Sequence, residues 1–388
     1  MKIRILGAGF SGLTLAYLLI RKGFQVEVIE RDSRVGGLIQ THRAPNLFSE
    51  SAANGLIANE KVLEMFKELG LDYLSAQKQS AKRFIFRGSP KRWPLTLFET
   101  LAMALRFLSN RIRRHHRPRP FETVTAWGNR ILGTAATSYL LQPALQGIYA
   151  GDIQHMSASL ILGKFFAKKK NKLGQLISPV NGMEELLTSL VRYIKAHGGQ
   201  VNLNCKDTTS NESIPTLYAI SSQAYQHSYF DHLELLSLVK VTVRWQKPAK
   251  KLNGYGILFP RDQGIRAIGV LSSDSIFGRT EELDTEAWIY GGATDPELTQ
   301  LSDAEILKLI AKDRESLFGS NDQMVSYKVC RWPRSLPHYN LDLEKHLNSL
   351  SHEEKMLFSG NFMGELGLSR IFLRNIEIAE YWGNQYGT

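Results

Sequence analysis

The sequence is poor in cysteine and has no long uncharged apolar run, and each absence excludes a class of protein. Cys205 and Cys330 are the only cysteines in 388 residues, too few for a disulfide scaffold or a cysteine-rich metal centre. They fit a reducing compartment. No stretch of about 18 apolar residues is free of charge, so no membrane-spanning helix is expected.

Acidic residues are outnumbered by basic ones, 37 against 48, which leaves a net charge of +11. This excess favours an anionic partner such as a lipid head group, nucleic acid or an acidic small molecule. We do not expect nucleic acid, because no nucleic-acid-binding module accompanies the arginines. Residues 1–23 have the cations and the apolar run of a secretory signal, but glycines interrupt the run and no small-residue cleavage site follows. We therefore expect a cytoplasmic protein.

The chain opens with the pattern of a dinucleotide-binding unit. Lys2–Leu6 is a short apolar run with β-branched residues, and Gln25–Ile29 is a second such run after a helical stretch. Three glycines follow the first run. Gly7 would allow a tight turn, Gly9 would let a pyrophosphate approach the backbone, and Gly12 would let the helix pack on the strand.

The ends of this unit also suit a nucleotide. Phe10 and Ser11 begin the helix, whose free N–H groups and partial positive charge attract phosphate. Glu30 ends the second strand and can accept hydrogen bonds from a ribose. Other α/β proteins carry glycine-rich turns, but strand, glycines, helix, strand and acid in this order favour a dinucleotide site.

The next residues indicate which dinucleotide. Arg31-Asp32-Ser33-Arg34-Val35-Gly36-Gly37 resembles the extended motif of the glutathione-reductase-like FAD proteins, in their amine-oxidase branch. The resemblance implies that Gly36 and Gly37 pass close to the FAD pyrophosphate and that Arg34 lies near a phosphate or the ribose. It also places Arg31 and Leu38 among the cofactor-binding residues. The alternative is a surface turn with solvated arginines.

The remaining sequence limits the kinds of flavin reaction that we expect. No second GxGxxG motif follows, so there is no obvious nicotinamide domain to supply hydride. This favours an oxidase that uses oxygen or a quinone, or a non-redox flavoprotein. There is no cysteine near the C-terminus in a setting that would indicate a covalent flavin, so FAD is expected to bind non-covalently.

Several later segments carry a more specific resemblance. They are residues 146–152 (QGIYAGD), 254–261 (GYGILFPR), 272–279 (SSDSIFGR), 331–333 (RWP) and 360–361 (GN). Together they resemble the protoporphyrinogen oxidase family, the FAD enzymes of haem synthesis. The matches run in order from residue 3 to about residue 365, nearly the whole chain.

This resemblance implies a porphyrinogen substrate, either protoporphyrinogen or coproporphyrinogen, and oxygen or another electron acceptor. It adds Trp332, Gly360 and Asn361 to the cofactor-binding residues. Asn54, Arg130 and Tyr149 become candidate substrate contacts, Arg130 because a guanidinium can bind a propionate through two hydrogen bonds. Structural roles are the alternatives for Arg130, Tyr149 and Trp332. No residue compels a general-base assignment, so the catalytic residues stay unknown, and no metal site is expected.

The expected fold class is α/β (α+β), with a glutathione-reductase-like FAD-binding Rossmann domain, a mixed-sheet substrate domain and a helical insertion. Such FAD folds are usually discontinuous. We expect the FAD-binding domain at residues 1–78, 176–228 and 349–388, and the substrate-binding domain at 229–348. Residues 79–175 would form the helical insertion, with a membrane-associating role left open. A homodimer is also left open.

A basic helical stretch within residues 79–175 has two interpretations. Five apolar residues recur at spacings of 4, 4, 3 and 4, and therefore share one face of a helix: Leu97, Leu101, Leu105, Leu108 and Ile112. Trp93 precedes them, and residues 111–119 hold five arginines and two histidines. These features fit peripheral attachment to anionic lipid at the inner face of the membrane. The alternative is a core-facing helix followed by a solvated basic loop.

The chain also departs from the family pattern. Residues 207–217 are a shorter connection than the family usually has between two strands of the nucleotide domain. Asn54 stands in a segment that often contains Gly-Pro, and Glu365-Leu366-Gly367 replaces the usual Gly-Val turn. Two alternatives therefore accompany the porphyrinogen oxidase. One is another FAD enzyme, such as an amine oxidase, a desaturase or a nucleotide-sugar mutase, and the other is a non-catalytic flavoprotein.

Overall fold

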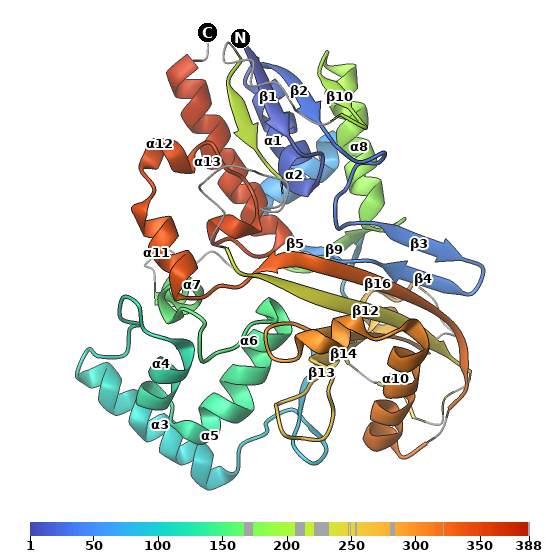
Figure 1. Ribbon diagram of the computed structural model, residues 1–388, viewed down its shortest axis with the longest axis vertical. Coiled ribbons are helices and arrows are strands. Elements are labelled where there is room, and N and C mark those ends of the chain that lie inside the picture. The colour runs from blue at the N-terminus through green and yellow to red at the C-terminus, as the bar shows by residue number, and fades with distance from the viewer. Residues whose placement is uncertain are drawn as a thin grey trace.

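The computed structural model describes residues 1–166, 174–205, 214–220, 233–246, 248, 250–252, 254–279, 284–320 and 322–386. Figure 1 shows a smaller sheet with its helices at the top, beside both termini, and a larger sheet across the middle and lower right. A group of helices lies at the lower left. The short connection predicted after Cys205 falls largely on residues 206–213, which lie outside the described residues.

The smaller sheet is parallel and holds the N-terminal unit. Its strands, in order across the sheet, are β10 (Gln200–Asn202), β2 (Gln25–Ile29), β1 (Lys2–Leu6) and β11 (Thr216–Tyr218). The helices that share its apolar core are α1 (Phe10–Arg21), α2 (Glu60–Glu68), α8 (Met183–Ala196) and α13 (Leu368–Tyr386). Strand side chains such as Ile3, Ile5 and Val28 are fully buried in that core. Parallel strands need such crossover helices, and α1 supplies the one between β1 and β2.

The larger sheet has seven strands of mixed direction. In order they are β16 (Met324–Pro337), β12 (Leu235–Trp245), β15 (Asp284–Gly291), β14 (Gly269–Ser272), β13 (Gly256–Leu258), β7 (Arg83–Phe86) and β8 (Pro90–Lys91). Among the strands of this sheet that the structure describes, only β13 and β7 run parallel to each other. Helix α10 (Asp303–Phe318) buries Ile306 and Ile310 in a core with strand residues such as Val241. A short helix, α9 (Ser273–Phe277), follows β14.

The segment at residues 79–175 differs from a purely helical insertion. It begins with β7 and β8, which extend the larger sheet because Phe84 pairs in register with Ile257 of β13. Its helices come after these strands. They are α3 (Leu97–Ile112), α4 (Val124–Ile131), α5 (Thr134–Ala136), a π-helical turn at Thr137–Leu141, α6 (Gln142–Tyr149) and α7 (Ala158–Leu162). The boundary expected at residues 228–229 lies outside the described residues.

Short strands and helices connect these parts. β3 (Thr41–Ala44) and β4 (Leu47–Glu50) form a hairpin, and β5 (Leu56–Ile57), β9 (Leu176–Pro179) and β6 (Tyr73–Ser75) form a three-stranded antiparallel sheet. Helices α11 (Leu341–Ser349) and α12 (His352–Lys355) lead from β16 to the last helix. Tyr339 and Leu343 share an apolar core with Trp127 of α4. Within the described ranges, no helix is long and apolar enough to cross a membrane.

Candidate functional site

The turn after β1 takes its shape from three glycines. Gly7 has a φ of +99°, and a Cβ at this position would lie 2.6 Å from the Ala219 carbonyl oxygen. A Cβ on Gly12 would lie 1.9 Å from the Gly7 carbonyl oxygen. By contrast, no atom lies within 4 Å of the Cβ position of Gly9. Gly7 and Gly12 are therefore required by packing, while Gly9 leaves space beside the backbone that a phosphate can enter.

Helix α1 begins without a side-chain cap. Gly9 occupies the N-cap position, no side chain accepts a hydrogen bond from the first turn, and that turn contains no acidic residue. Phe10 anchors the start of the helix in the core, where it is buried, and Ser11 follows it half-buried. The free N–H groups and the positive end of the helix dipole are suited to a phosphate.

Glu30 is buried at the end of β2, beside the glycine turn. Its Oε2 accepts a hydrogen bond from Ala8 N at 2.8 Å, and its Oε1 accepts one from Asp32 N at 3.0 Å. These bonds fix the carboxylate, and each oxygen keeps a second lone pair for a ribose hydroxyl. Arg31 instead points to solvent and pairs with Asp32 at 3.6 Å.

A second glycine turn lies against the first. Gly36 N donates to Ala8 O at 2.8 Å, and Gly36 forms a parallel β-bridge with Gly9. A Cβ on Gly37 would have Gly9 Cα as its nearest neighbour, at 3.7 Å. The two turns that the sequence assigns to the pyrophosphate are therefore adjacent in the structure.

Arg34 fastens this second turn. Its guanidinium donates hydrogen bonds to the carbonyl oxygens of Val35, Gly37 and Ile39, at 3.1, 2.6 and 3.3 Å. The side chain thus stabilises the loop through backbone contacts. Leu38, within the same turn, is 38% exposed and offers an apolar surface there.

Asn375 joins the C-terminal helix to the N-terminal turn. Its side chain is fully buried, and Nδ2 donates to Ser11 O and to Thr14 Oγ1, both at 2.8 Å. Its Oδ1 accepts a hydrogen bond from Ser359 Oγ. Gly360 and Asn361 follow Ser359 directly, so the predicted last cofactor segment is brought to the start of α1.

Ser51 connects the second glycine turn to the larger sheet. Its hydroxyl donates to Leu38 O at 2.7 Å and accepts from Gln40 N at 2.8 Å. Its carbonyl oxygen accepts a hydrogen bond from Trp332 Nε1 at 3.1 Å. Ser51 is therefore hydrogen-bonded to both Leu38 and Trp332, two residues that the sequence assigns separately to the cofactor.

Lys240 is a candidate functional residue that the sequence analysis missed. It lies on β12, is 6% exposed, and its Nζ donates to Asn54 Oδ1 at 3.1 Å and to Ala52 O at 3.2 Å. Burial lowers its pKa to about 8, so the amine can hold or release a proton near neutral pH. The only sequence signal is a lysine in the middle of an apolar β-strand pattern, residues 238–243 (LVKVTV).

Glu50 is a second buried charge next to this loop. Its Oε1 accepts a hydrogen bond from Met183 N and its Oε2 accepts one from Thr41 Oγ1, both at 2.9 Å. Burial raises the pKa of this carboxyl, and the nearby cations Arg279 and Lys240 oppose the shift. The carboxylate thereby ties the start of α8 to the loop at residues 50–54, which carries Ser51 and Asn54.

Tyr149 lies beside the C-terminal segment. Its ring centroid is 4.9 Å from that of Tyr339, in an edge-to-face arrangement, and Tyr339 donates a hydrogen bond to Asn361 O. Burial raises the pKa of the Tyr149 hydroxyl. The structure thus gives Tyr149 a packing role, and Tyr339 connects it to Asn361.

Arg130 is engaged in contacts within the helical region. Its Nε and one terminal nitrogen donate to the Glu122 carboxylate at 2.8 and 2.6 Å. Further bonds go to the carbonyl oxygens of His115 and Arg117, at 2.5 and 3.2 Å. The guanidinium therefore holds together the chain between α3 and α4, which supports the structural alternative for this residue.

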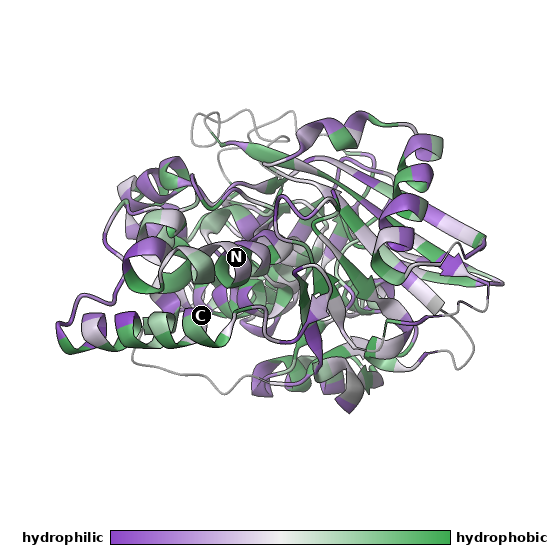
Figure 2. Cartoon of the chain, turned by 90° about the horizontal axis from the view of Figure 1, so that it is seen from below, coloured by the Kyte–Doolittle hydropathy of each residue, from purple (hydrophilic) through white to green (hydrophobic). Residues whose placement is uncertain are grey.

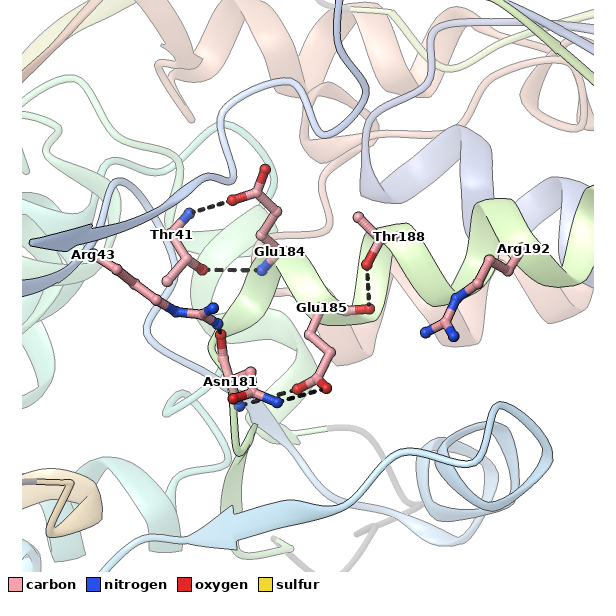
Figure 3. A pocket seen from close by; sticks show the side chains of 7 residues that line it. All are labelled: Thr41, Arg43, Asn181, Glu184, Glu185, Thr188 and Arg192. Atoms are coloured by element: carbon pink, nitrogen blue, oxygen red, sulfur yellow. Dashed lines mark hydrogen bonds between the residues drawn. The ribbon is translucent and has the colours of Figure 1, made fainter.

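A polar hollow of about 640 Å³ lies over the first turns of α8 (Figure 3). Its lining residues are Thr41, Arg43, Asn181, Glu184, Glu185, Thr188 and Arg192. Figure 3 shows that several of them bond to one another, for example Glu184 N to Thr41 Oγ1 at 3.1 Å. None of the predicted cofactor or substrate residues lines it, so we do not place the site there. No His, Cys, Asp or Glu cluster suited to a metal ion occurs among the residues that the structure describes.

Sequence comparisons point to flavin chemistry. A family model described as flavin containing amine oxidoreductase matches residues 10–208, just over half of the chain. Protoporphyrinogen oxidase 2 of Arabidopsis thaliana is 23% identical over 98% of this chain and 93% of its own length. Coproporphyrinogen III oxidase of Bacillus subtilis (strain 168) is 20% identical over 92% of each chain.

Solved structures share the fold over nearly the full length. A putative protoporphyrinogen oxidase from Exiguobacterium sp. 255-15 has a TM-score of 0.80 at 19% identity, covering 99% of each chain. Putrescine oxidase bound to putrescine has a TM-score of 0.73 at 16% identity, covering 98% of this chain and 99% of its own. Reduced UDP-galactopyranose mutase also has 0.73, at 12% identity, covering 100% and 96%. These likenesses confirm the predicted architecture.

Proposed function

Because this chain belongs to the flavin-containing amine oxidoreductase family, we propose that it is an FAD-dependent oxidase of porphyrinogens in haem synthesis. The proposed reaction converts protoporphyrinogen IX to protoporphyrin IX, or coproporphyrinogen III to coproporphyrin III, with oxygen or another acceptor taking the electrons. The observation that carries the proposal is the alignment of two oxidases named for these substrates with more than nine-tenths of the chain.

The residues of the two glycine turns fit FAD, held non-covalently. Gly9 leaves its side of the backbone open, the first turn of α1 is uncapped, and Glu30 has lone pairs for a ribose. Phe10, Ser11, Gly36, Gly37 and Leu38 complete the N-terminal part of the proposed site, with Arg34 holding the second turn. Trp332 on β16, with Gly360 and Asn361 in the C-terminal segment, completes the proposed site. When bound, FAD supplies two-electron oxidation, and the protein supplies position and an enclosed pocket.

The proposed substrate contacts lie where the loop at residues 50–54 meets the larger sheet. Lys240 fixes Asn54 and the Ala52 carbonyl, and so holds the side chain that is proposed to meet the substrate. Tyr149 is the proposed contact on the side of the C-terminal segment. We do not extend the proposal to Arg130, because its guanidinium already binds Glu122 and two backbone carbonyls.

Porphyrin fluorescence tests the proposal directly. Purified protein saturated with FAD is mixed in air with protoporphyrinogen or with coproporphyrinogen, and boiled protein corrects for spontaneous oxidation. We expect a rate well above the boiled control with one of them, and the ratio of the two rates identifies the preferred substrate. No excess rate with either, despite a bound-flavin spectrum, would contradict aerobic porphyrinogen oxidation.

Another flavoenzyme activity is the second candidate, because putrescine oxidase and UDP-galactopyranose mutase share the fold at similar TM-scores. Turnover of an amine, or binding of a nucleotide sugar by the flavin-loaded protein, would favour it. Protein that retains no flavin would favour a non-catalytic role. The proposal places the protein in the cytoplasm, in contact with the inner face of the membrane. It leaves a homodimer open, and light scattering would test for one.

A further inference from the structure

Three fully buried polar side chains connect the first helix with the C-terminal part of the chain. They are Thr14 on α1, Ser359 in the segment after α12, and Asn375 on α13, which packs along α1 (Figure 1). Figure 2 shows hydrophobic residues gathered through the middle of the molecule, and the core between α1 and α13 is apolar. Polar groups in such surroundings cost stability unless they are hydrogen-bonded. The hydrogen bonds of these three residues therefore show what the cluster holds in place.

Asn375 donates to one end of the chain and accepts from the other. Its Nδ2 donates to Ser11 O and to Thr14 Oγ1, both at 2.8 Å. Its Oδ1 accepts from the Ser359 hydroxyl. One amide thus connects the first turn of α1 directly to the residue that precedes Gly360.

The orientation of this amide is fixed by its partners. Ser11 O is a carbonyl oxygen, which can only accept a hydrogen bond. The Thr14 hydroxyl already donates to Phe10 O at 2.7 Å, so its oxygen is left to accept from Asn375. The amide nitrogen must therefore face α1, and the amide oxygen must face Ser359.

The backbone of Ser359 is bound to the smaller sheet. Its N–H donates to Tyr218 O at 2.8 Å. Tyr218 ends β11 and pairs in register with Leu6, the last residue of β1. The segment before Gly360 therefore lies at the carboxyl ends of these strands, which is the edge where open α/β sheets bind ligands.

The order of the strands separates the two ends of a dinucleotide. The smaller sheet has the order β10-β2-β1-β11, and Glu30 follows β2 directly. The first glycine turn follows β1, and Ser359 is bonded to the end of β11. A ribose at Glu30 and a pyrophosphate at the glycine turn would place the other half of FAD, the flavin half, on the side of β11 and Gly360.

A tight turn begins immediately after Ser359. Gly360 has a φ of +152°, and a Cβ at this position would lie 2.5 Å from a carbon of the Phe362 ring. Asn361 follows, and its carbonyl oxygen accepts a hydrogen bond from Tyr339. Because the turn leaves no room, a displacement of Ser359 would displace Gly360 and Asn361 with it.

We propose that Asn375 is a positioning residue for FAD. It acts through Ser11 and Ser359, and it holds the pyrophosphate end and the flavin end of the site at the separation that one dinucleotide requires. This role rests on the proposed function, since FAD is taken as the cofactor. It goes further in assigning a residue on α13 that neither binds FAD itself nor belongs to a predicted motif.

FAD and ADP should respond differently to the loss of this amide. FAD gains affinity by binding at both ends, because its second half meets its partners at a high effective concentration when they lie within reach. ADP lacks the flavin half and would use only the glycine turns and Glu30. Those turns are held independently of Asn375, by Gly36 N on Ala8 O and by Ala8 N on Glu30 Oε2, both at 2.8 Å.

The affinities of FAD and ADP for the full chain test this role. Dilution of the flavin-loaded protein gives the Kd of FAD from the recovery of flavin fluorescence, and displacement of FAD by ADP gives the Kd of ADP. The variant is Asn375→Leu/Ser359→Ala, because Asn375→Leu alone would leave the Ser359 hydroxyl buried without its partner. We expect the Kd of FAD to rise at least about tenfold and that of ADP to stay within about twofold.

Trp382, also on α13, provides the matched control. Its Nε1 donates to Met356 O at 3.2 Å, a bond that holds the segment leading to Ser359 without involving α1. Trp382→Phe should lower the unfolding temperature, because it removes this bond and part of a buried side chain. The ratio of the two Kd values should nevertheless stay within about twofold of the wild-type ratio. An equal change of this ratio in both variants would assign Asn375 to stability alone.

Two further results would overturn the positioning role. In the double variant, the Kd values of FAD and ADP could rise by the same factor, or both could stay at the wild-type value. Failure of the proposed function would look different. A wild type that binds neither FAD nor ADP would reject the cofactor and the positioning role together. A wild type that shows the expected change of ratio but forms no porphyrin would reject the reaction and support the role of Asn375.

Discussion

Lys240 Nζ lies 3.1 Å from Asn54 Oδ1, and this contact joins the larger sheet to the loop at residues 50–54, which follows strand β4. Trp332 Nε1, on the adjacent strand β16, makes a second such contact with Ser51 O. Two neighbouring strands of the larger sheet are therefore hydrogen-bonded to the short loop that carries Ser51 and Asn54.

Replacing Lys240 with methionine should change how stability depends on pH. The pKa of the buried amine is lowered from 10.5 to about 8, so the folded chain loses this proton at lower pH than the unfolded chain does. Stability from this group consequently rises with pH between those two values. In urea unfolding, the free energy of unfolding of the wild type should rise by about 3 kcal/mol relative to that of Lys240→Met over that pH interval. Lys308→Met, at an exposed position of α10, is the control, and a pH-independent difference for Lys240→Met would contradict the prediction.

Alanine at Gly12 should affect stability, whereas alanine at Gly9 should affect cofactor binding. A Cβ on Gly12 would lie 1.9 Å from Gly7 O, so Gly12→Ala should lower the free energy of unfolding by at least about 2 kcal/mol. Gly9 has a φ of −75° and open space around its Cβ position, so Gly9→Ala should change it by less than about 0.5 kcal/mol. Gly9→Ala should instead weaken FAD binding, measured by flavin fluorescence. Unimpaired FAD binding by a stable Gly9→Ala variant would count against the pyrophosphate site.

Glu30→Gln should weaken FAD binding at least tenfold, or about 1.4 kcal/mol. The amide oxygen can accept only on one side, whereas the carboxylate accepts from both Ala8 N and Asp32 N. Asp32→Asn is the matched control, because the Asp32 carboxylate is exposed and contacts the exposed Arg31. Its FAD affinity should stay within about twofold of wild type. Equal affinities for all three proteins would show that Glu30 does not contact the ribose.

Asp313→Asn should stabilise the protein at neutral pH. Burial raises the pKa of Asp313 from 3.8 to about 6, and Tyr290 donates a hydrogen bond to it at 3.1 Å. The folded state therefore binds the extra proton between these pH values, and this group's contribution to stability is lost as pH rises through about 6. The variant should match wild type near pH 4 and exceed it by up to about 3 kcal/mol at pH 7. Thermal or urea unfolding at both pH values measures the difference, and a wild type more stable at pH 7 would refute it.

Arg130→Gln separates a structural role from substrate binding. Because the guanidinium binds Glu122, we expect Arg130→Gln and Glu122→Gln to lower the unfolding temperature by similar amounts. The KM for the porphyrinogen should stay within about twofold in both, at a temperature where each is folded. A KM that rises about tenfold or more in Arg130→Gln alone would instead support the propionate contact predicted from the family resemblance.

Local patterns were sufficient for the N-terminal unit. The first strand, the glycines and the helix are each predicted from neighbouring residues. In the structure, β1, α1 and β2 follow one another in the predicted order. The predicted place in the amine-oxidase branch is confirmed by the family model, and the predicted architecture by the solved structures. The contacts of individual residues with cofactor and substrate stay predictions.

Other features could not be read from the sequence because they depend on distant parts of the chain. The burial of Lys240 requires β12 to be covered by the loop at residues 50–54, and strand periodicity does not say what covers a strand. Arg130 fits a carboxylate in either interpretation, and only the fold shows that the carboxylate of Glu122 is already there.

The glycine turns, the strand-helix-strand unit and the family could be predicted from the amino-acid order alone, because each depends on local geometry or on ordered motifs. The folded chain was needed to show that Asn375 brings the C-terminal segment to Ser11, and that the leucines of α3 face solvent. Helical periodicity gathers apolar residues on one side of a helix, but the packing of the remaining chain decides whether that side meets a core or water.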